Sequence, residues 1–227
     1  MTTFHPTARS RARRLPKRAS YDVDTVHRIL DAGLVCHVGY VIDGEPYVTP
    51  TAYWREDDHI YWHGSRASRM LEAVANGVRV CVTVTHLDGL VAARSGFHHS
   101  INYRSVMLFG RPRRIDDPDA KRAALDAFIE RIYPARVSEI RPPTPKEVKA
   151  TTVVAMTIDE ASAKARSGGP LDDEGDYALP VWAGVIPVEA RFGAPIADAR
   201  LPKNTPLPDY LRRLVGSSLG APRRGHR

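Results

Sequence analysis

The sequence contains no apolar run long enough to span a membrane, and no apolar segment follows its basic N-terminus as a secretory signal requires. Cysteine is scarce, and Cys36 and Cys81 form no CxxC pair. Both lie in apolar, strand-like runs, which is typical of buried thiols in a reducing compartment. We therefore expect a cytoplasmic protein with no membrane partner.

Familiar catalytic and nucleotide-binding motifs are also missing. The chain has no GxxxxGK[ST], GxGxxG or GxSxG, and no HxH or HExxH spacing. Cys36 and His37 are adjacent, but neighbours on a strand point to opposite faces and cannot act as a nucleophile–base pair. Five histidines cluster without ligand spacing, so no metal site is predicted; they are His59, His63, His86, His98 and His99.

The positive charge of the chain is concentrated at its ends. The formal net charge is +7, and residues 1–18 and 210–227 together carry eleven cations and no acid, which leaves −4 on residues 19–209. A mildly acidic body argues against specific nucleic-acid binding by the fold itself. Residues 1–20 are expected to form a basic disordered arm, residues 21–190 one folded domain, and residues 191–227 a proline-rich arm with a basic tail.

Hydrophobic periodicity predicts a mainly β protein. A helix over residues 21–32 is followed by strands over 34–42, 46–54 and 59–63, and Asp43-Gly44 and Asp57-Asp58 provide the turns of an antiparallel meander. Asp88-Gly89 is read as a further turn. The other expected elements are helices over 67–76 and 119–132 and strands over 78–85, 90–94, 103–115, 151–158 and 181–188. Six or more strands with few helices indicate a closed or nearly closed antiparallel barrel with a few peripheral α-helices.

The stretch from Ile60 to Met70 leads from an aromatic strand end, at Trp62 and His63, into a helix. Ser65 and Ser68 can cap that helix, and Arg66 and Arg69 add guanidinium groups beside free backbone N–H groups. This combination suits a phosphate-bearing ligand. A plain surface helix with a serine cap has the same pattern.

Polar residues also interrupt several strand patterns. Pro50, between Thr49 and Thr51, suits an edge strand whose free backbone groups can meet a planar heterocycle. Trp182 can stack on a ring. The remaining polar candidates are Tyr103, Arg104, Ser105, Lys164 and Arg166.

Taken together, these residues resemble the flavin-nucleotide-binding branch of the pyridoxamine 5′-phosphate oxidase-like split-barrel superfamily, which includes nitroimidazole-reductase-like relatives. The resemblance spans about residues 20–190 and is specific only in combination. The resembling segments are Thr49–Tyr53, Tyr61–Leu71, Asp88–Ser95, Phe97–Val106, Ser162–Arg166 and Trp182–Pro187.

The resemblance implies a homodimeric split β-barrel, antiparallel and Greek-key-like, with FMN at the subunit interface. The strand ending at Tyr53 is then expected along the isoalloxazine ring, and the turn with Ser65, Ser68 and Arg69 at the phosphate. The full set of expected cofactor-binding residues is Thr49, Pro50, Thr51, Tyr53, Trp62, His63, Ser65, Ser68, Arg69, Tyr103, Arg104, Ser105, Lys164, Arg166 and Trp182.

Two departures from the family pattern bear on function. Arginine stands at position 69, where such oxidases commonly have lysine, and should serve an anion equally well. The C-terminal Arg–His substrate signature is not visible after Trp182, so oxidation of vitamin B6 is not expected. The expected function is an FMN-dependent oxidoreductase of unknown small-molecule substrate, in which the flavin carries the chemistry and His63 is a candidate donor. The alternatives are a non-catalytic flavin or haem carrier and an F420-dependent reductase.

Overall fold

The computed structural model describes residues 2–220 of the 227-residue chain. None of the helices in that range is both long and apolar enough to cross a membrane. The elements follow in the order η1 (Pro16–Arg18), β1 (Ala19–Ser20), α1 (Val23–Asp31), β2 (Val35–Ile42), β3 (Glu45–Glu56), β4 (His59–Ser65), α2 (Arg69–Ala75), β5 (Val80–Ala92), β6 (Ser100–Gly110), β7 (Arg113–Arg114), α3 (Pro118–Ile132), η2 (Val137–Glu139), α4 (Pro145–Ala150), β8 (Thr151–Thr157), β9 (Ala161–Arg166), η3 (Glu174–Ala178), β10 (Gly184–Pro187) and α5 (Asp209–Arg212).

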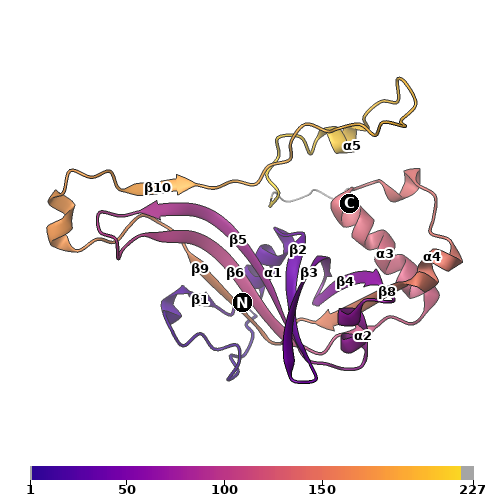
Figure 1. Ribbon diagram of the computed structural model, residues 1–227, viewed down its shortest axis with the longest axis horizontal. Coiled ribbons are helices and arrows are strands. Elements are labelled where there is room, and N and C mark those ends of the chain that lie inside the picture. Colours follow the sequence, from indigo (N-terminus) through magenta and orange to yellow (C-terminus); the bar gives the residue numbers. More distant parts are fainter. Residues whose placement is uncertain (1, 221–227) are drawn as a thin grey trace.

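The described strands form one antiparallel sheet in the order β1-β9-β6-β5-β2-β3-β4-β8-β7, and β10 pairs with the distal part of β5. The end strands β1 and β7 do not pair with each other within the described residues, so the sheet curls into a barrel that stays open (Figure 1). The prediction of a mainly β split barrel with peripheral helices is confirmed.

The core forms because the predicted periodicities place apolar side chains on one side of each element. Helix α1 begins where the Asp22 carboxylate accepts a hydrogen bond from the Thr25 amide, and it buries Val26, Ile29 and Leu30. The β2–β3 hairpin turns at Asp43-Gly44, where both residues have positive φ, 52° and 84°. A type I′-like turn of this kind joins two strands that share the right-handed twist.

The structure corrects the expectation of a turn at Asp88-Gly89. Strand β5 runs without interruption from Val80 to Ala92, and only its register with β6 shifts between Leu87 and Gly89. The glycine is needed for close approach, because a Cβ there would lie 3.1 Å from the Ile186 carbonyl oxygen of β10. The distal halves of β5 and β6 together with β10, called here the arm, extend away from the barrel (Figure 1).

The N-terminal segment, expected to be disordered, is held against the barrel in this structure. Arg9 forms a two-pronged ion pair with Glu160, which Thr7 also contacts, and the Lys164 ammonium donates to the Arg14 carbonyl. Glu160 is 8% exposed, and a nearly buried carboxylate requires such partners. The C-terminal segment returns to the helical end of the molecule, where Arg136 contacts the Tyr210 hydroxyl at 2.9 Å. The last part of the expected basic tail, residues 221–227, lies outside the described residues.

We predict that Arg9→Ala lowers the melting temperature at neutral pH and that this difference disappears in acid. The Arg9 hydrogen bond, followed by the Thr7 contact and the Arg9 charge, lowers the pKa of Glu160. A lowered pKa contributes stability that is present above the unfolded-state pKa, about 4.3, and is lost as the pH falls through the folded-state value. Thermal melts from pH 7 to pH 3 measure this. Arg11→Ala is the control, and a difference that persists at pH 3 would contradict the ion-pair assignment.

Candidate functional site

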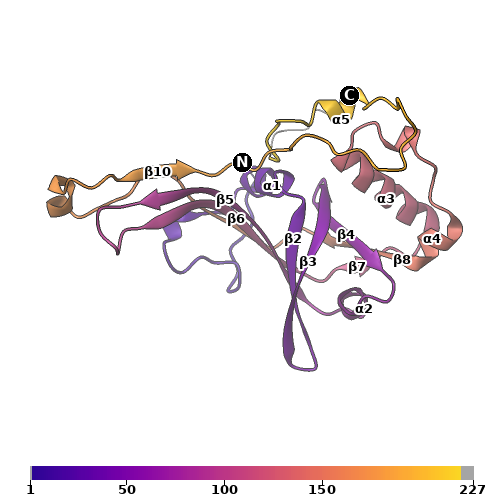
Figure 2. The same ribbon diagram turned by 45° about the horizontal axis from the view of Figure 1, so that its top comes forward.

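Strands β3 and β4 are paired at one end only. Residues 53–56 of β3 pair with residues 59–62 of β4, whereas residues 45–52 of β3 pair within the described chain only with β2. Beyond Trp62, β4 continues along β8 alone, and the β2–β3 hairpin diverges from it (Figure 2). We call the unpaired flanks, residues 48–52 of β3 and 63–65 of β4, the open edge.

The backbone of the open edge presents free polar groups. The Tyr53 amide donates to the Leu34 carbonyl at 3.1 Å, so Tyr53 faces β2. Since antiparallel pairing alternates along a strand, Thr51 and Thr49 also face β2, whereas Ala52 and Pro50 face the open side. Pro50 has no N–H group to leave unsatisfied. The edge strand expected from this proline is therefore present, and no second strand of the described chain pairs with the Ala52 N–H or the Pro50 carbonyl.

The turn after β4 lies beside the open edge. The Ser68 hydroxyl accepts from the Leu71 amide at 3.4 Å and caps α2, and the Ser65 hydroxyl accepts from the Ala67 amide at 3.2 Å. Helix α2 has seven residues, so its dipole is small, and any anion here depends on side chains. Arg69 is exposed, and its guanidinium carbon lies 4.8 Å from the centre of the Tyr47 ring. No carboxylate in residues 2–220 pairs with it.

The structure assigns Tyr53 and Trp62, two of the expected cofactor contacts, to the core. Their side chains are 1% and 0% exposed, and the Tyr53 hydroxyl donates to the Leu30 carbonyl. Burial raises the pKa of this phenol, so it stays protonated. The two residues are Cα partners, and their side chains share the inner face of the barrel. A ligand at the open edge can reach their backbone but not their rings.

The remaining expected contacts lie elsewhere, because β5 and β2 separate β6 and β9 from β3. Arg104 pairs with Asp88 through two bonds of 2.8 and 2.9 Å, and Arg166 is 9% exposed and bonded to Asn102 and to the Gly168 and Gly169 carbonyls. The others occupy the same flank: Tyr103 in β6, Ser105 donating to the Lys164 carbonyl, and Trp182, 65% exposed, before β10. One chain does not bring these residues to the open edge.

His63 projects toward helix α3, away from the core. Its ring centre lies 4.7 Å from that of Phe128 and 5.9 Å from that of Trp54. The Nδ1 atom is buried and has no hydrogen-bond partner among the described residues. Burial lowers the pKa of the imidazole, so it is neutral at physiological pH. His63 forms part of the wall of a cavity of about 590 Å³ between β4, α3 and the segment leading to α4.

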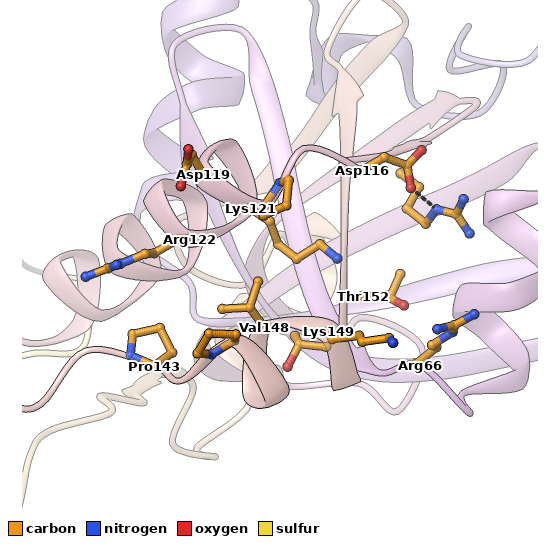
Figure 3. A pocket seen from close by; sticks show the side chains of 13 residues that line it. Arg66, Asp116, Asp119, Lys121, Arg122, Pro143, Val148, Lys149 and Thr152 are labelled. Carbon is orange, nitrogen blue, oxygen red and sulfur yellow. Dashed lines mark hydrogen bonds and ion pairs between the residues drawn. The ribbon is translucent and has the colours of Figure 1, made fainter.

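A second cavity, of about 520 Å³, lies beside the first and shares Arg122 and Pro143 with it. Figure 3 shows cationic side chains from the β4–α2 turn, α3 and α4 around it. The cations are Arg66, Arg114, Lys121, Arg122 and Lys149, and only Arg114 has an ion-pair partner in the described chain, Asp116 at 2.5 Å. Sequence analysis missed this group because its members are spread over more than eighty residues and match no motif.

Comparisons with known proteins agree with this architecture. The family model described as pyridoxamine 5′-phosphate oxidase matches residues 22–165. No curated protein sequence matches the chain.

Three solved structures illustrate the similarity. The flavocytochrome Anf3 from Azotobacter vinelandii is 43% identical, with a TM-score of 0.88, over 94% of this chain and 100% of that one. The FAD and heme binding protein from Mycobacterium smegmatis is 39% identical, with a TM-score of 0.85, over 89% and 98%. A putative 5-nitroimidazole antibiotic resistance protein from Bacteroides thetaiotaomicron is 24% identical, with a TM-score of 0.54, over 65% and 86%, and shares the fold. The chain therefore belongs to the pyridoxamine 5′-phosphate oxidase-like family of split-barrel proteins.

Proposed function

We propose that the chain binds a flavin nucleotide, FMN, at the open edge and serves as a flavin-dependent oxidoreductase. The observation that carries this proposal is the separation of β3 from β4 directly beside a cationic turn. When bound, the flavin supplies hydride and electron transfer. The protein contributes binding, orientation and exclusion of water.

The open edge fits the ring of such a cofactor. A flavin's pyrimidine portion carries both donors and acceptors, and the free Ala52 N–H and Pro50 carbonyl offer one of each along a strand. Because these are backbone groups of a paired strand, they are held in position before the ligand arrives. Such preorganisation lowers the entropy lost on binding.

The turn beside the open edge fits the phosphate. Arg69 has no carboxylate partner among residues 2–220, and Ser65 and Ser68 supply hydroxyl donors. Arg66, on the same turn, instead lines the cationic cavity (Figure 3). The two arginines therefore offer two phosphate subsites. FMN has one phosphate and needs only the Arg69 subsite, whereas FAD has a second phosphate, for which Arg66 is available.

The similar proteins support the proposal that the chain binds a flavin. They make FAD a candidate nucleotide beside FMN. One solved relative is described as a flavocytochrome and another as an FAD and heme binding protein. Both FMN and FAD contain the flavin ring, which suits the open edge, and a first phosphate, which suits Arg69.

We further propose a homodimer in which the arm of each subunit covers its partner. Ile186, Leu90 and Ile101 are cross-strand neighbours on one face of the arm and are 52%, 47% and 46% exposed, and Phe97 beyond them is 91% exposed. A contiguous apolar surface of this kind is typical of an interface. A symmetric partner would also supply residues of β6, β9 and the Trp182 segment to an open edge that a single chain leaves incomplete.

For the ring, we expect amide exchange to identify the open edge. In the flavin-free protein the Ala52 amide should exchange faster than those of Thr49 and Thr51, which face β2. Adding FMN or riboflavin should slow exchange at Ala52 and leave Thr51 unchanged. NMR-detected hydrogen exchange measures this, and protection of Ala52 before flavin is added would exclude the site.

For the phosphate, Arg69→Ala should weaken FMN binding about ten- to hundredfold, since it removes a charge-assisted contact to a dianion. Riboflavin, which lacks the phosphate, should bind equally to both proteins, and Arg69→Lys should retain most of the affinity. Arg66→Ala is the matched variant: it should leave FMN binding unchanged and weaken FAD if the second phosphate enters the cationic cavity. Proportional losses of FMN and riboflavin in Arg69→Ala would sink the phosphate assignment.

For the assembly, light scattering of the flavin-loaded protein should give twice the 25.2 kDa chain mass. Placing charges in the apolar row, as in Leu90→Glu with Ile186→Glu, should yield monomers that bind flavin weakly. Ile196→Glu, at a residue that is 97% exposed and outside the arm, should remain dimeric. A monomer that binds FMN as tightly as the wild type would refute the shared site.

A further inference from the structure

The cationic cavity, the space of about 520 Å³ beside the β4–α2 turn, collects positive charge from separate parts of the chain. Its cations come from that turn, β7, α3 and α4 (Figure 3). Five cations line it together with two acids, Asp116 and Asp119, which leaves a formal charge of +3. Like charges repel, and a cleft lined by one sign of charge concentrates their field. An anion that enters this cavity relieves the repulsion.

The acids near the cavity do not neutralise these cations. Asp116 is bonded to Arg114 at 2.5 Å. Glu147, on α4, is held by both terminal nitrogens of Arg141 and by the Thr144 amide. Within residues 2–220, no ion pair involves the other four cations, which are Arg66, Lys121, Arg122 and Lys149. Their charge is therefore available to a ligand.

A buried hydroxyl also lines this cavity without a partner. Thr152 lies on β8 opposite Gly64 of β4 and is 7% exposed, and its hydroxyl forms no hydrogen bond within the described chain. Buried hydroxyls normally have a partner, because leaving one unpaired costs free energy. Figure 3 shows the Lys149 ammonium and the Arg66 guanidinium on the same side of the cavity as Thr152. All three groups can donate, so this side suits a ligand rich in acceptor oxygens.

The rest of the lining is apolar and stiff. It is supplied by Pro118, Pro143, Pro145 and Val148. Proline has a fixed φ and no amide N–H, so these residues add a firm apolar surface but no further donors. A volume of about 520 Å³ is within the range of small-molecule sites. A matching ligand thus combines several negative oxygens with a ring or another apolar portion, as the phosphate esters of a nucleoside do.

We propose that the cationic cavity binds a nucleotide that carries a phosphate monoester in addition to a pyrophosphate. A monoester brings a charge of about −1.5 to −2 and three acceptor oxygens. FAD accounts for the cavity less well: with its first phosphate at Arg69, it would bring one diester charge into a lining of +3. Two sources share the proposed chemistry, the phosphorylated nicotinamide dinucleotide NADPH and coenzyme A.

The nicotinamide source deepens the proposed flavin function and rests on it. NADPH would transfer the hydride at C4 of its dihydronicotinamide ring to the flavin: one C–H bond breaks, one N–H bond forms, and two electrons pass from the nicotinamide to the flavin. Arg66 and Arg69 belong to the same turn, so a nucleotide in the cavity and a flavin phosphate at Arg69 would bind side by side. Coenzyme A would occupy the cavity without any redox step.

The first test is calorimetric titration of the FMN-loaded full-length protein with NADP⁺, NAD⁺, coenzyme A and dephospho-coenzyme A. NADP⁺ is used because it cannot reduce the flavin. A compound with the monoester should bind about tenfold or more tightly than its counterpart without it, since the monoester gains charge-assisted contacts. The tighter of NADP⁺ and coenzyme A identifies the source. Equal binding within both pairs, or no binding, would overturn the proposal.

The second test locates the ligand with variants. Lys149→Ala should weaken the binding of NADP⁺ or coenzyme A, whichever binds more tightly, about ten- to hundredfold. Lys146→Ala is the matched control, because Lys146 is an exposed lysine of the same helix that does not line the cavity, and it should leave binding unchanged. Equal losses in the two variants would contradict the assignment.

Thr152→Val removes the unpartnered hydroxyl and keeps the shape of the side chain. Binding of the same nucleotide should weaken about two- to tenfold, the worth of one hydrogen bond. The melting temperature of the ligand-free protein should stay the same or rise, because no hydrogen bond within the described chain is lost. A lower melting temperature with unchanged nucleotide binding would show that the hydroxyl serves the fold, and would overturn its role as a ligand contact.

Flavin measurements separate this proposal from the flavin proposal. Lys149→Ala and Thr152→Val should bind FMN as the wild type does, because the open edge and Arg69 are intact. Protein that prefers the monoester of coenzyme A but binds no flavin would support the cavity and refute the flavin function alone. Protein loaded with FAD should bind the nucleotide as well as protein loaded with FMN. Loss of nucleotide binding in the FAD-loaded protein alone would assign the cavity to FAD and overturn the proposal.

Discussion

The structure depends on the point at which β3 leaves β4. Two large side chains, Tyr53 and Trp62, are opposite each other on the last paired position and are almost completely buried. Their burial fixes where pairing ends, because moving either strand by one residue would turn its large ring out to solvent. The free backbone of the open edge follows from this pair, since the β2–β3 hairpin can diverge only beyond it. Tyr53 and Trp62 therefore position the candidate flavin site without contacting its ligand.

Much of the fold was predictable from local patterns. The alternation of β2 and β3, the Asp43-Gly44 turn and the Asp22-capped helix α1 each depend on interactions within a few residues. The same reasoning fails at Asp88-Gly89, where the glycine is required by β10, a strand that arrives almost one hundred residues later. A local motif cannot distinguish a glycine required by a turn from a glycine required because a strand distant in sequence packs closely against it.

The residue types of the candidate site could be predicted from the sequence. How these residues are distributed between the open edge, the core and the cavities could not. Pro50 correctly indicated an edge, whereas Tyr53 and Trp62, expected as cofactor contacts, are buried in the core. Arg66 and Arg69 are three residues apart but face different surroundings. This difference depends on the turn between them and on Tyr47 across the open edge. Likewise the apolar face of α3 reads as core packing, because periodicity is the same whether a helix covers a sheet or lines a cavity.

Strand β4 lies between the open edge and the cavity beside α3. The backbone of His63 borders the open edge, where β4 has lost its β3 partner, while its side chain faces the α3 cavity. Alternation along the strand places Trp62 in the core between these two environments. The open edge and the cavity are thus separated by a single strand, which pairs with β8 along its whole length. Because β4 stays paired with β8 where it has lost β3, one short segment borders both the open edge and the cavity.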